Sequence, residues 1–590
     1  MKTLHMIGNA HLDPVWLWHW QEGYQENIAT FRSALDRLSE YDDVVFTSSS
    51  AQFYEWIEQH DPQLFDRIRE RVRQKRWIIC GGWWVESDCN IPCGESFARQ
   101  ALLAQNYYQE KFGVHCRTGY NVDSFGHNGM LPQLLRQSGM DRYVFMRPGP
   151  QEKQLPGRTF LWESRDGSQV MAYRIPGSYG TFGGIEEHIV SCLQEFDPGI
   201  DDLMCFFGIG NHGGGPTIEN IEGIRRVQKT MPGTRIIFGD PDSYFDSIAE
   251  KHPNLPVVKE DLQHHATGCY SALSEVKKWN RRAENALLRA EKTAVISNII
   301  ARSIYPKNFS GAWKNVLFNQ FHDIIAGTGI ASAYEAARDQ YGEALSIAAR
   351  NENAAFQAIS SCIRIPQEEA MRPFVVFNPH SWETNATIEV ETGNFLGRSE
   401  ASYTVMDPSD NELPCQIIPA EAKMENRNRI VFQAKIPAMG YVTFRVYPRQ
   451  IPESKRTSLP PMMLENEFLR VVFDANTGGI SSVYDKKEQT EYAAGNWALP
   501  IVIEDVSDTW AHDVKKFDQV IGKFSPVMIR LEESGPVRST LCVKSVYARS
   551  TLVQRFTLYQ NRDELEVSAE LNWQERRKCL KLEFPCAFED

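Results

Sequence analysis

Short apolar runs alternate with amphipathic, helix-like stretches over the first 265 residues of this 590-residue chain. Strands that alternate with helices build βαβ units, in which consecutive strands lie parallel in a sheet or barrel. The sequence therefore predicts an N-terminal α/β domain, barrel-like in form, over residues 1–265. The runs that we expect to be strands cover residues 44–47, 77–80, 119–122, 143–145, 170–174, 204–207, 236–238 and 257–259.

The composition then changes, and Ala, Glu, Arg and Leu dominate the next hundred or so residues. Helical periodicity over residues 281–302 and 334–363 predicts a helical bundle, which we place at residues 266–366. One helix of this bundle is expected to carry His322 near its end, followed by the glycine-containing residues 326–329, which should end it. Its buried face has apolar residues at three- and four-residue spacing, namely Trp313, Val316, Leu317 and Phe321.

Turn-forming residues separate short apolar runs after residue 366, a pattern typical of antiparallel sandwich sheets. We therefore predict a β-sandwich region over residues 367–590. Strand-like sequence continues almost to Asp590, which leaves open whether the sandwich is complete. The expected fold is thus multidomain α/β plus all-β, because a chain of this length exceeds what one hydrophobic core usually supports.

The formal net charge of −13 is modest for this length. Nucleic acids and anionic membranes attract basic faces, so the charge argues against both as partners and favours a neutral or weakly charged substrate. The N-terminus lacks the pattern of a signal peptide, and no apolar stretch has the length of a membrane span. We therefore expect a cytoplasmic protein with reduced cysteines, and a homo-oligomer stays open.

Histidine and aspartate residues follow predicted strands at several points. His11 and Asp13 come after one apolar run and Asp123 after another, and the active sites of α/β folds form at the carboxyl ends of strands. Imidazole nitrogens and carboxylate oxygens suit zinc, and a catalytic zinc keeps one position for water or substrate. A single such residue more often caps a loop. Together with His322, however, they indicate a metal site.

Five short segments, in order along the chain, resemble the motifs of the zinc-dependent α-mannosidases of glycoside hydrolase family 38. Each motif is weak by itself, but the ordered set is specific and extends over most of the chain. The segments are residues 11–16 (HLDPVW), 81–88 (GGWWVESD), 121–127 (NVDSFGH), 263–270 (QHHATGCY) and 320–327 (QFHDIIAG).

The resemblance implies that one Zn²⁺ ion is held by His11, Asp13, Asp123 and His322. It also implies that Asp123 is the nucleophile of a retaining, exo-acting α-mannosidase that forms a covalent glycosyl-enzyme. The substrate would be a mannose-containing oligosaccharide or glycoside, because zinc can bind two vicinal hydroxyls and the axial 2-hydroxyl of mannose completes such a pair. The linkage preference stays open.

The resemblance also implies a sugar subsite. Trp16 and Phe125 correspond to aromatic residues that pack on the bound sugar. Arg147 and Asp323 correspond to polar residues that line the mannose subsite.

The chain departs from the family pattern at the position expected to hold the acid/base residue. Related bacterial and cytosolic members carry an Asp in the Gly-rich loop at residues 208–216, where this chain has Asn211. An amide cannot donate and recover a proton at neutral pH, whereas a histidine titrates near about pH 6.5. His212 is therefore the predicted acid/base. The alternatives are that His212 positions the substrate or that a carboxylate elsewhere in the chain is the acid/base.

Several further residues have two interpretations. Glu86 and Asp88 follow a strand, where they either orient metal ligands or cap the next helix. His127, His264 and His265 either line the cleft or are structural.

Two other functions fit parts of the same pattern. A zinc-dependent carbohydrate deacetylase also uses Asp and His ligands at strand ends. A catalytically silent sugar-binding protein would explain Asn211 and the abrupt C-terminus.

Overall fold

The computed structural model describes residues 1–231, 233–391, 401–420, 428–450, 462–512, 514 and 516–588. The chain divides into two compact units. The first comprises residues 1–356 with 508–513, and the second comprises residues 357–507 with 514–590. Every helix of the described residues is too short or too polar to cross a bilayer.

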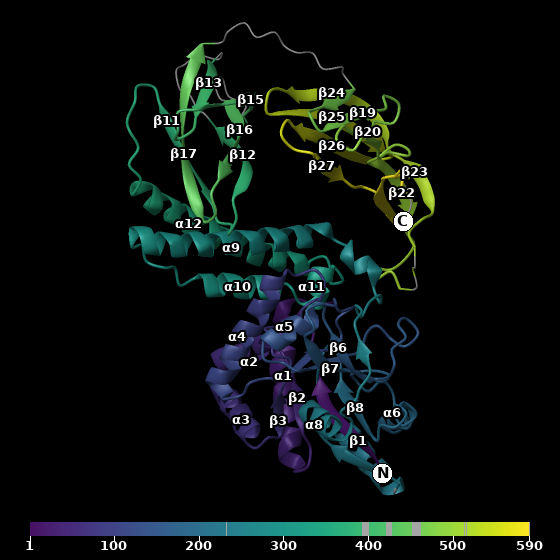
Figure 1. The fold of residues 1–590 in the computed structure, drawn as a ribbon. Helices are drawn as coiled ribbons and strands as arrows, with labels where there is room; N and C mark the ends of the chain where they lie inside the picture. Colours follow the sequence, from purple (N-terminus) through teal and green to yellow (C-terminus); the bar gives the residue numbers. More distant parts are fainter. Residues whose placement is uncertain are drawn as a thin grey trace. The chain divides into compact units, whose positions relative to one another are not determined.

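A five-stranded sheet forms the centre of the first unit, and all of its pairings are parallel (Figure 1). Its central strand β1 pairs with three others, and Leu4, Met6 and Ile7 on this strand are fully buried. Such a continuous apolar run is typical of a parallel strand that is covered on both faces. The strands are β1 (Lys2–Ala10), β2 (Phe46–Ser48), β3 (Trp77–Ile79), β8 (Asp202–Ile209) and β9 (Thr234–Phe238).

A second five-stranded sheet has the order β10-β6-β7-β5-β4. Its strands are β4 (Thr118–Asn121), β5 (Arg142–Phe145), β6 (Thr159–Glu163), β7 (Gln169–Arg174) and β10 (Val257–Val258), and only the β6–β7 pairing is antiparallel. The Gly81 N–H donates to Thr118 O at 2.9 Å, so the end of β3 meets the start of β4. The predicted α/β alternation is confirmed. The described strands form two sheets rather than one closed ladder, and the barrel itself is not confirmed.

Helices connect these strands and cover the sheets. They are α1 (Trp20–Glu40), α2 (Ala51–His60), α3 (Pro62–Arg73), α4 (Gly94–Phe112), α5 (Leu131–Gln137), α6 (Ile185–Cys192), α7 (Ile218–Thr230) and α8 (Pro241–Lys251).

The predicted helical segment is also confirmed, and α9 and α10 run side by side (Figure 1). It contains a short 3₁₀ helix, Thr267–Tyr270, followed by α9 (Ser274–Ala301), α10 (Phe309–Phe318), α11 (His322–Ala326) and α12 (Ala333–Ser361).

The expectation that His322 ends a long helix is wrong, because His322 begins the separate helix α11. The chain leaves α10 after Phe318 and pairs with the segment that follows β3. The Asp88 N–H donates to Gln320 O at 2.9 Å, and the His322 N–H donates to Glu86 O at 3.2 Å. These bonds replace the helical ones and break the helix. Gly327 then ends α11 at a φ of 84°, as the sequence indicated.

The second unit consists of antiparallel sheets, as the sequence predicted. Two sheets, β11-β17-β13-β14 and β12-β16-β15, enclose one buried apolar cluster. Sheets β18-β19-β20-β21 and β24-β25-β26-β27 enclose another, and β23-β22-β28 completes the set. The strands are β11 (Arg372–Asn378), β12 (Thr384–Glu391), β13 (Ala401–Met406), β14 (Glu412–Leu413), β15 (Cys415–Pro419), β16 (Asn428–Ile436), β17 (Gly440–Gln450), β18 (Met463–Glu465), β19 (Leu469–Phe473), β20 (Ile480–Asp485), β21 (Thr490–Glu491), β22 (Leu499–Glu504), β23 (Val520–Lys523), β24 (Ser525–Ser534), β25 (Arg538–Tyr547), β26 (Ser550–Tyr559), β27 (Leu565–Asn572) and β28 (Lys578–Glu583).

Helix α1 packs closely against the loop that leaves β1. A Cβ added to the buried Gly23 would lie 2.2 Å from Pro14 O, so Gly23→Ala must displace this loop. We expect the substitution to cost about 1–3 kcal/mol of unfolding free energy, as overpacking in a core does. Gly342→Ala is the control, because Gly342 lies in α12 with no atom within 4 Å of an added Cβ. It should gain about 0.5–1 kcal/mol. Denaturant unfolding measures both, and equal effects would contradict the close approach.

Candidate metal centre and its cavity

Four buried side chains meet at the carboxyl ends of the two sheets. The donor atoms of His11, Asp13, Asp123 and His322 all lie within 4.8 Å of one another. His11 Nε2 lies 2.9 Å from Asp13 Oδ1 and 3.5 Å from Asp123 Oδ2, and His322 Nε2 lies 3.7 and 3.8 Å from the same two oxygens. Donors arranged tetrahedrally around an ion at 2.0–2.2 Å would be about 3.3–3.6 Å apart. The cluster thus has the dimensions of a metal site.

Three parts of the chain deliver the four candidate ligands. His11 directly follows β1, and the Asp13 N–H donates to Asn211 O at 2.8 Å, which ties this loop to the one after β8. Asp123 follows β4, and His322 is the first residue of α11.

The tautomer of His322 indicates that the cluster is built for a cation. His322 Nδ1 lies 3.1 Å from Glu86 O, and a carbonyl only accepts, so Nδ1 carries the proton. In the neutral ring, Nε2 then turns a lone pair towards two carboxylates, and this atom has no hydrogen-bond partner among the described residues. A buried acceptor that faces two anions is unfavourable unless a positive charge lies between them. The donor set therefore fits a metal ion.

Glu86 holds three of these ligands in place. Its Oε1 accepts from the Asp123 N–H at 2.7 Å, its Oε2 lies 3.4 Å from His11 Nδ1, and its carbonyl accepts from His322. Burial raises the pKa of Glu86, but the neighbouring His11 and His322 and the hydrogen bonds that Glu86 accepts outweigh this and hold the pKa below its ordinary value. Of its two interpretations from the sequence, the structure supports ligand orientation.

Asp88 does not cap the next helix, because α4 begins at Gly94 with Cys93 as its N-cap. Its Oδ1 accepts from the backbone N–H groups of Asn90 and Ile91 at 2.8 and 2.7 Å, so it closes a turn in the loop before that helix.

A cavity of about 310 Å³ opens beside the cluster. This is the size of a small-molecule site, and its wall combines aromatic rings with a few convergent polar groups. Its lining includes every residue that the sequence assigned to the sugar subsite. The lining residues are Asp13, Trp16, Asp123, Phe125, Met146, Arg147, Ser178, Tyr179, Phe182, Asn211, His265, Asp323, Asp508, Trp510 and His512.

Arg147 contacts the predicted nucleophile directly. Its Nη1 pairs with Asp123 Oδ1 and also donates to Asp123 O at 3.1 Å. Burial lowers the pKa of Arg147, although nearby acidic groups oppose this. Asp123 therefore directs Oδ2 to the other residues of the cluster and Oδ1 to the guanidinium of Arg147.

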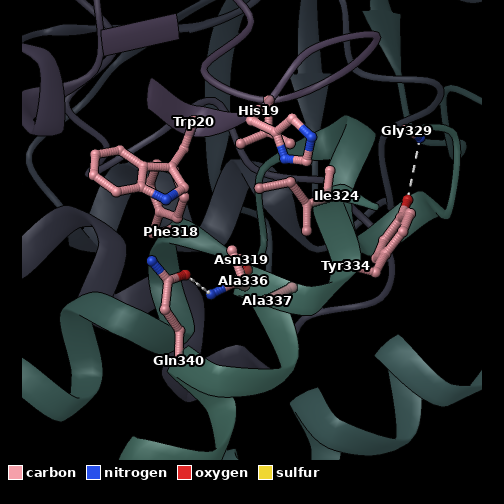
Figure 2. Close-up of a pocket in the computed structure, with 12 residues that line it drawn as sticks. His19, Trp20, Phe318, Asn319, Ile324, Gly329, Tyr334, Ala336, Ala337 and Gln340 are labelled. Carbon is pink, nitrogen blue, oxygen red and sulfur yellow. Dashed lines mark hydrogen bonds between the residues drawn. The ribbon is translucent and has the colours of Figure 1, made fainter. Parts of the chain in front are cut away.

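Asp323 is held by hydrogen bonds from Thr328 and Tyr334, and Tyr334 also lines a second, small pocket (Figure 2). The Thr328 hydroxyl donates to its carboxylate, and the Tyr334 hydroxyl donates to its carbonyl at 3.3 Å and accepts from the Gly329 N–H. Burial raises the pKa of Asp323 to about 7. The pocket itself is lined mainly by apolar side chains, including Trp20, Phe318 and Ile324, and it supports the site rather than extending it.

Tyr179 was not identified from the sequence. Its hydroxyl oxygen lies 2.6 Å from Asn211 Oδ1 and 3.2 Å from Asp123 Oδ2, so its one proton can serve either oxygen. Burial raises the pKa of Tyr179 to about 12. Asn211 thus lines the cavity as the hydrogen-bond partner of this tyrosine.

The predicted acid/base His212 is placed elsewhere. Its Nε2 lies 2.8 Å from Glu22 Oε1, its ring packs edge-on against Trp18, and it does not line the cavity. The loop bends at Asn211, where φ is 66°, so successive side chains point to different sides.

Residues 508–512 complete the cavity wall from a distant part of the sequence. Trp510 packs edge-on against Trp16 and Phe125, with ring centroids 6.4 and 6.5 Å apart, and its carbonyl accepts from the Gly268 N–H. His512 Nδ1 lies 2.8 Å from Asp508 Oδ2. No motif in the sequence marks this segment, because only its tertiary position connects it with the site.

Two of the remaining histidines are now distinguished. His127 is buried between the Tyr143 hydroxyl and the Arg147 carbonyl, and burial lowers its pKa to about 4, which makes it structural. His265 lines the cavity and pairs with Glu152 at 2.7 Å.

Family models match this chain in three parts. They are described as Glycosyl hydrolases family 38 N-terminal domain, Alpha mannosidase middle domain and Glycosyl hydrolases family 38 C-terminal domain, and they match residues 1–268, 264–359 and 464–590. The chain belongs to glycosyl hydrolase family 38.

Curated relatives extend this comparison. The chain is 25% identical over 619 residues to Alpha-mannosidase G of Dictyostelium discoideum, which covers 98% of this chain and 56% of that protein. It is 28% identical to Alpha-mannosidase 2C1 of Homo sapiens, covering 99% and 54%. The chain thus spans about half the length of these relatives. A solved α-mannosidase from Enterococcus faecalis has the same fold, with a TM-score of 0.82 at 17% identity over 99% of this chain and 75% of that one.

The position of Glu86 generates a test of the metal centre. In Glu86→Gln, an amide N–H₂ can face His11 Nδ1 and favour the tautomer whose Nε2–H points into the cluster. We expect the affinity for a divalent metal to fall about 10–100-fold, as when other partners of metal ligands are replaced. Asp88→Asn is the control, because its Oδ1 can still accept both backbone bonds. Competition with a chelator measures the dissociation constants, and an unchanged value for Glu86→Gln would refute this orienting role.

Proposed function

We propose that this chain is a retaining, exo-acting α-mannosidase that hydrolyses mannose-containing glycosides with the help of one zinc ion. The observation that carries the proposal is the His322 lone pair, which faces Asp13 and Asp123 at the floor of an aromatic-walled cavity. Family membership and the names of the relatives support it.

Zinc suits the donor set of two imidazoles and two carboxylates. His11, Asp13, Asp123 and His322 would hold the ion, which would act as a Lewis acid towards two vicinal hydroxyls of the sugar. The Glu86 carboxylate lies next to the His11 ring, and the Glu86 carbonyl accepts from the His322 ring. The two imidazoles therefore need little reorganisation to bind the ion.

Asp123 is the proposed nucleophile. Arg147 holds its Oδ1, and Tyr179 approaches its Oδ2, so the carboxylate is oriented on two sides. The contact with Arg147 also favours the ionised form that must attack the anomeric carbon.

The aromatic wall would bind the sugar ring. Trp16, Phe125 and Trp510 surround the cavity, and flat rings offer apolar surface to the C–H face of a sugar. Arg147 and Asp323 supply charged groups for its hydroxyls. This arrangement favours a single neutral sugar unit, as exo-action requires.

The proton donor must come from the cavity wall, about 5–5.5 Å from the nucleophile in a retaining enzyme. The sequence predicts His212 for this role, but its imidazole faces Glu22. His512 lines the cavity and is oriented by Asp508, an arrangement that suits a general acid. We therefore propose His512 for this step.

Loss of the nucleophile tests the whole proposal. Asp123→Ala should lower kcat for 4-nitrophenyl α-mannoside by at least roughly 10⁴-fold, and removal of the metal by a chelator should abolish turnover until zinc is restored. Asp66→Ala is the control, because Asp66 is exposed on α3. Release of acetate from acetylated sugars would support the deacetylase instead. Sugar binding without either reaction would support the silent binding protein.

Two histidines provide a matched test of the proton donor. His512 and His212 are both about half exposed, with side-chain exposures of 46% and 44%, and both contact a carboxylate at 2.8 Å. We expect His512→Ala to lower kcat/KM about 10²–10⁴-fold and to remove the alkaline limb of its pH profile, since that limb reports the general acid. His212→Ala should leave rate and profile unchanged. The reverse result would restore the sequence-based prediction.

A further inference from the structure

A second cluster of potential metal ligands lies apart from the first in sequence and shares no residue with it. His188 and Cys192 lie one turn apart on α6, and Cys205 lies on the neighbouring strand β8. Their donor atoms are all within 4.8 Å of one another. We propose that His188, Cys192 and Cys205 form a site for a thiophilic cation of the Zn²⁺ class.

The geometry suits such an ion. Residues four apart on a helix face the same side, which is how His188 and Cys192 come together. Cys192 Sγ lies 3.8 Å from His188 Nε2. Sulfur and nitrogen donors held tetrahedrally at zinc distances of 2.3 and 2.0–2.1 Å would be about 3.6 Å apart. The distance between Cys192 Sγ and His188 Nε2 therefore needs only a small adjustment.

The chemistry of the thiols also suits a cation. Both sulfur atoms are in free cysteines that are buried in the core of the first unit. Cysteine binds metals as the thiolate, so binding of the ion would release the protons of the two thiols.

His188 lies on the access route to the site, and the Phe206 carbonyl beside it offers a fourth donor atom. It is partly exposed, whereas both cysteines are buried, so an ion would enter past the imidazole. Nε2 also lies 2.9 Å from Phe206 O, to which it donates when no ion is present. Binding would require the His188 tautomer with its proton on Nδ1, so that Nε2 holds the ion and the Phe206 carbonyl oxygen faces it.

An ion here would join two elements next to the catalytic cavity. The Thr181 N–H donates to Gly208 O at 2.8 Å, so the loop between β7 and α6, which carries Tyr179, already runs along β8. A bond from α6 to β8 would fasten the end of this loop. The proposal itself does not depend on mannosidase activity.

Cobalt distinguishes the two clusters, because only a thiolate ligand gives a sulfur-to-cobalt charge-transfer band in the near ultraviolet. The demetallated full chain is titrated with Co²⁺. We expect the band in the unmodified chain and in Asp123→Ala, which removes a ligand of the catalytic cluster only. Cys192→Ala and Cys205→Ala should abolish it. Cys80→Ala, which removes another buried thiol of the same core, should keep it.

A third variant covers the case in which the cysteine variants do not fold. His188→Gln replaces a partly exposed side chain, and it should raise the Co²⁺ dissociation constant at least about tenfold while circular dichroism stays unchanged. Absence of the band at saturating Co²⁺ would overturn the proposal. So would a band that survives both His188→Gln and Cys192→Ala, or a Cys192–Cys205 disulfide in protein purified under reducing conditions.

Discussion

The contacts of Glu86 are the constraint on which the site depends. One residue bonds the backbone of Asp123, faces the His11 ring with its carboxylate and accepts from His322 through its carbonyl. The bond to the Glu86 carbonyl fixes the Nδ1 proton of His322, whereas His11 Nε2 lies 2.9 Å from Asp13 Oδ1. A buried carboxylate is costly unless it is satisfied, and Glu86 Oε1 accepts from the backbone N–H groups of Asp123 and Ser124.

The fold brings the ligands together by two different routes. The parallel strands β1 and β4 deliver His11 and Asp123 at their carboxyl ends, as α/β folds generally do. His322 arrives from the helical segment, because the chain stops its helix after α10 and pairs with residues 86–88. The break between α10 and α11, which the sequence did not predict, is thus the feature that places His322 in the cluster.

The cavity wall contains residues from the family-like motifs and residues from outside them. Trp16, Phe125, Arg147 and Asp323 line a cavity next to the cluster of His11, Asp13, Asp123 and His322. Tyr179 and residues 508–512 add hydrogen-bonding and aromatic groups that no sequence motif indicated. The departure at Asn211 is accommodated by Tyr179, whose hydroxyl contacts both this amide and Asp123. The Gly-rich loop therefore contributes a neutral partner to the surroundings of Asp123.

The sequence by itself determined the order of the α/β, helical and β regions, because hydrophobic periodicity is a local property. It also indicated the four ligands, since the resemblance lies in short contiguous motifs around them. The tertiary structure alone decided which groups face one another. Glu86 lies against three residues of the cluster, Asp88 closes a turn, His212 faces Glu22, and His512 lines the cavity from far along the chain. Side-chain direction and long-range contact depend on how the chain packs, and no local pattern encodes them.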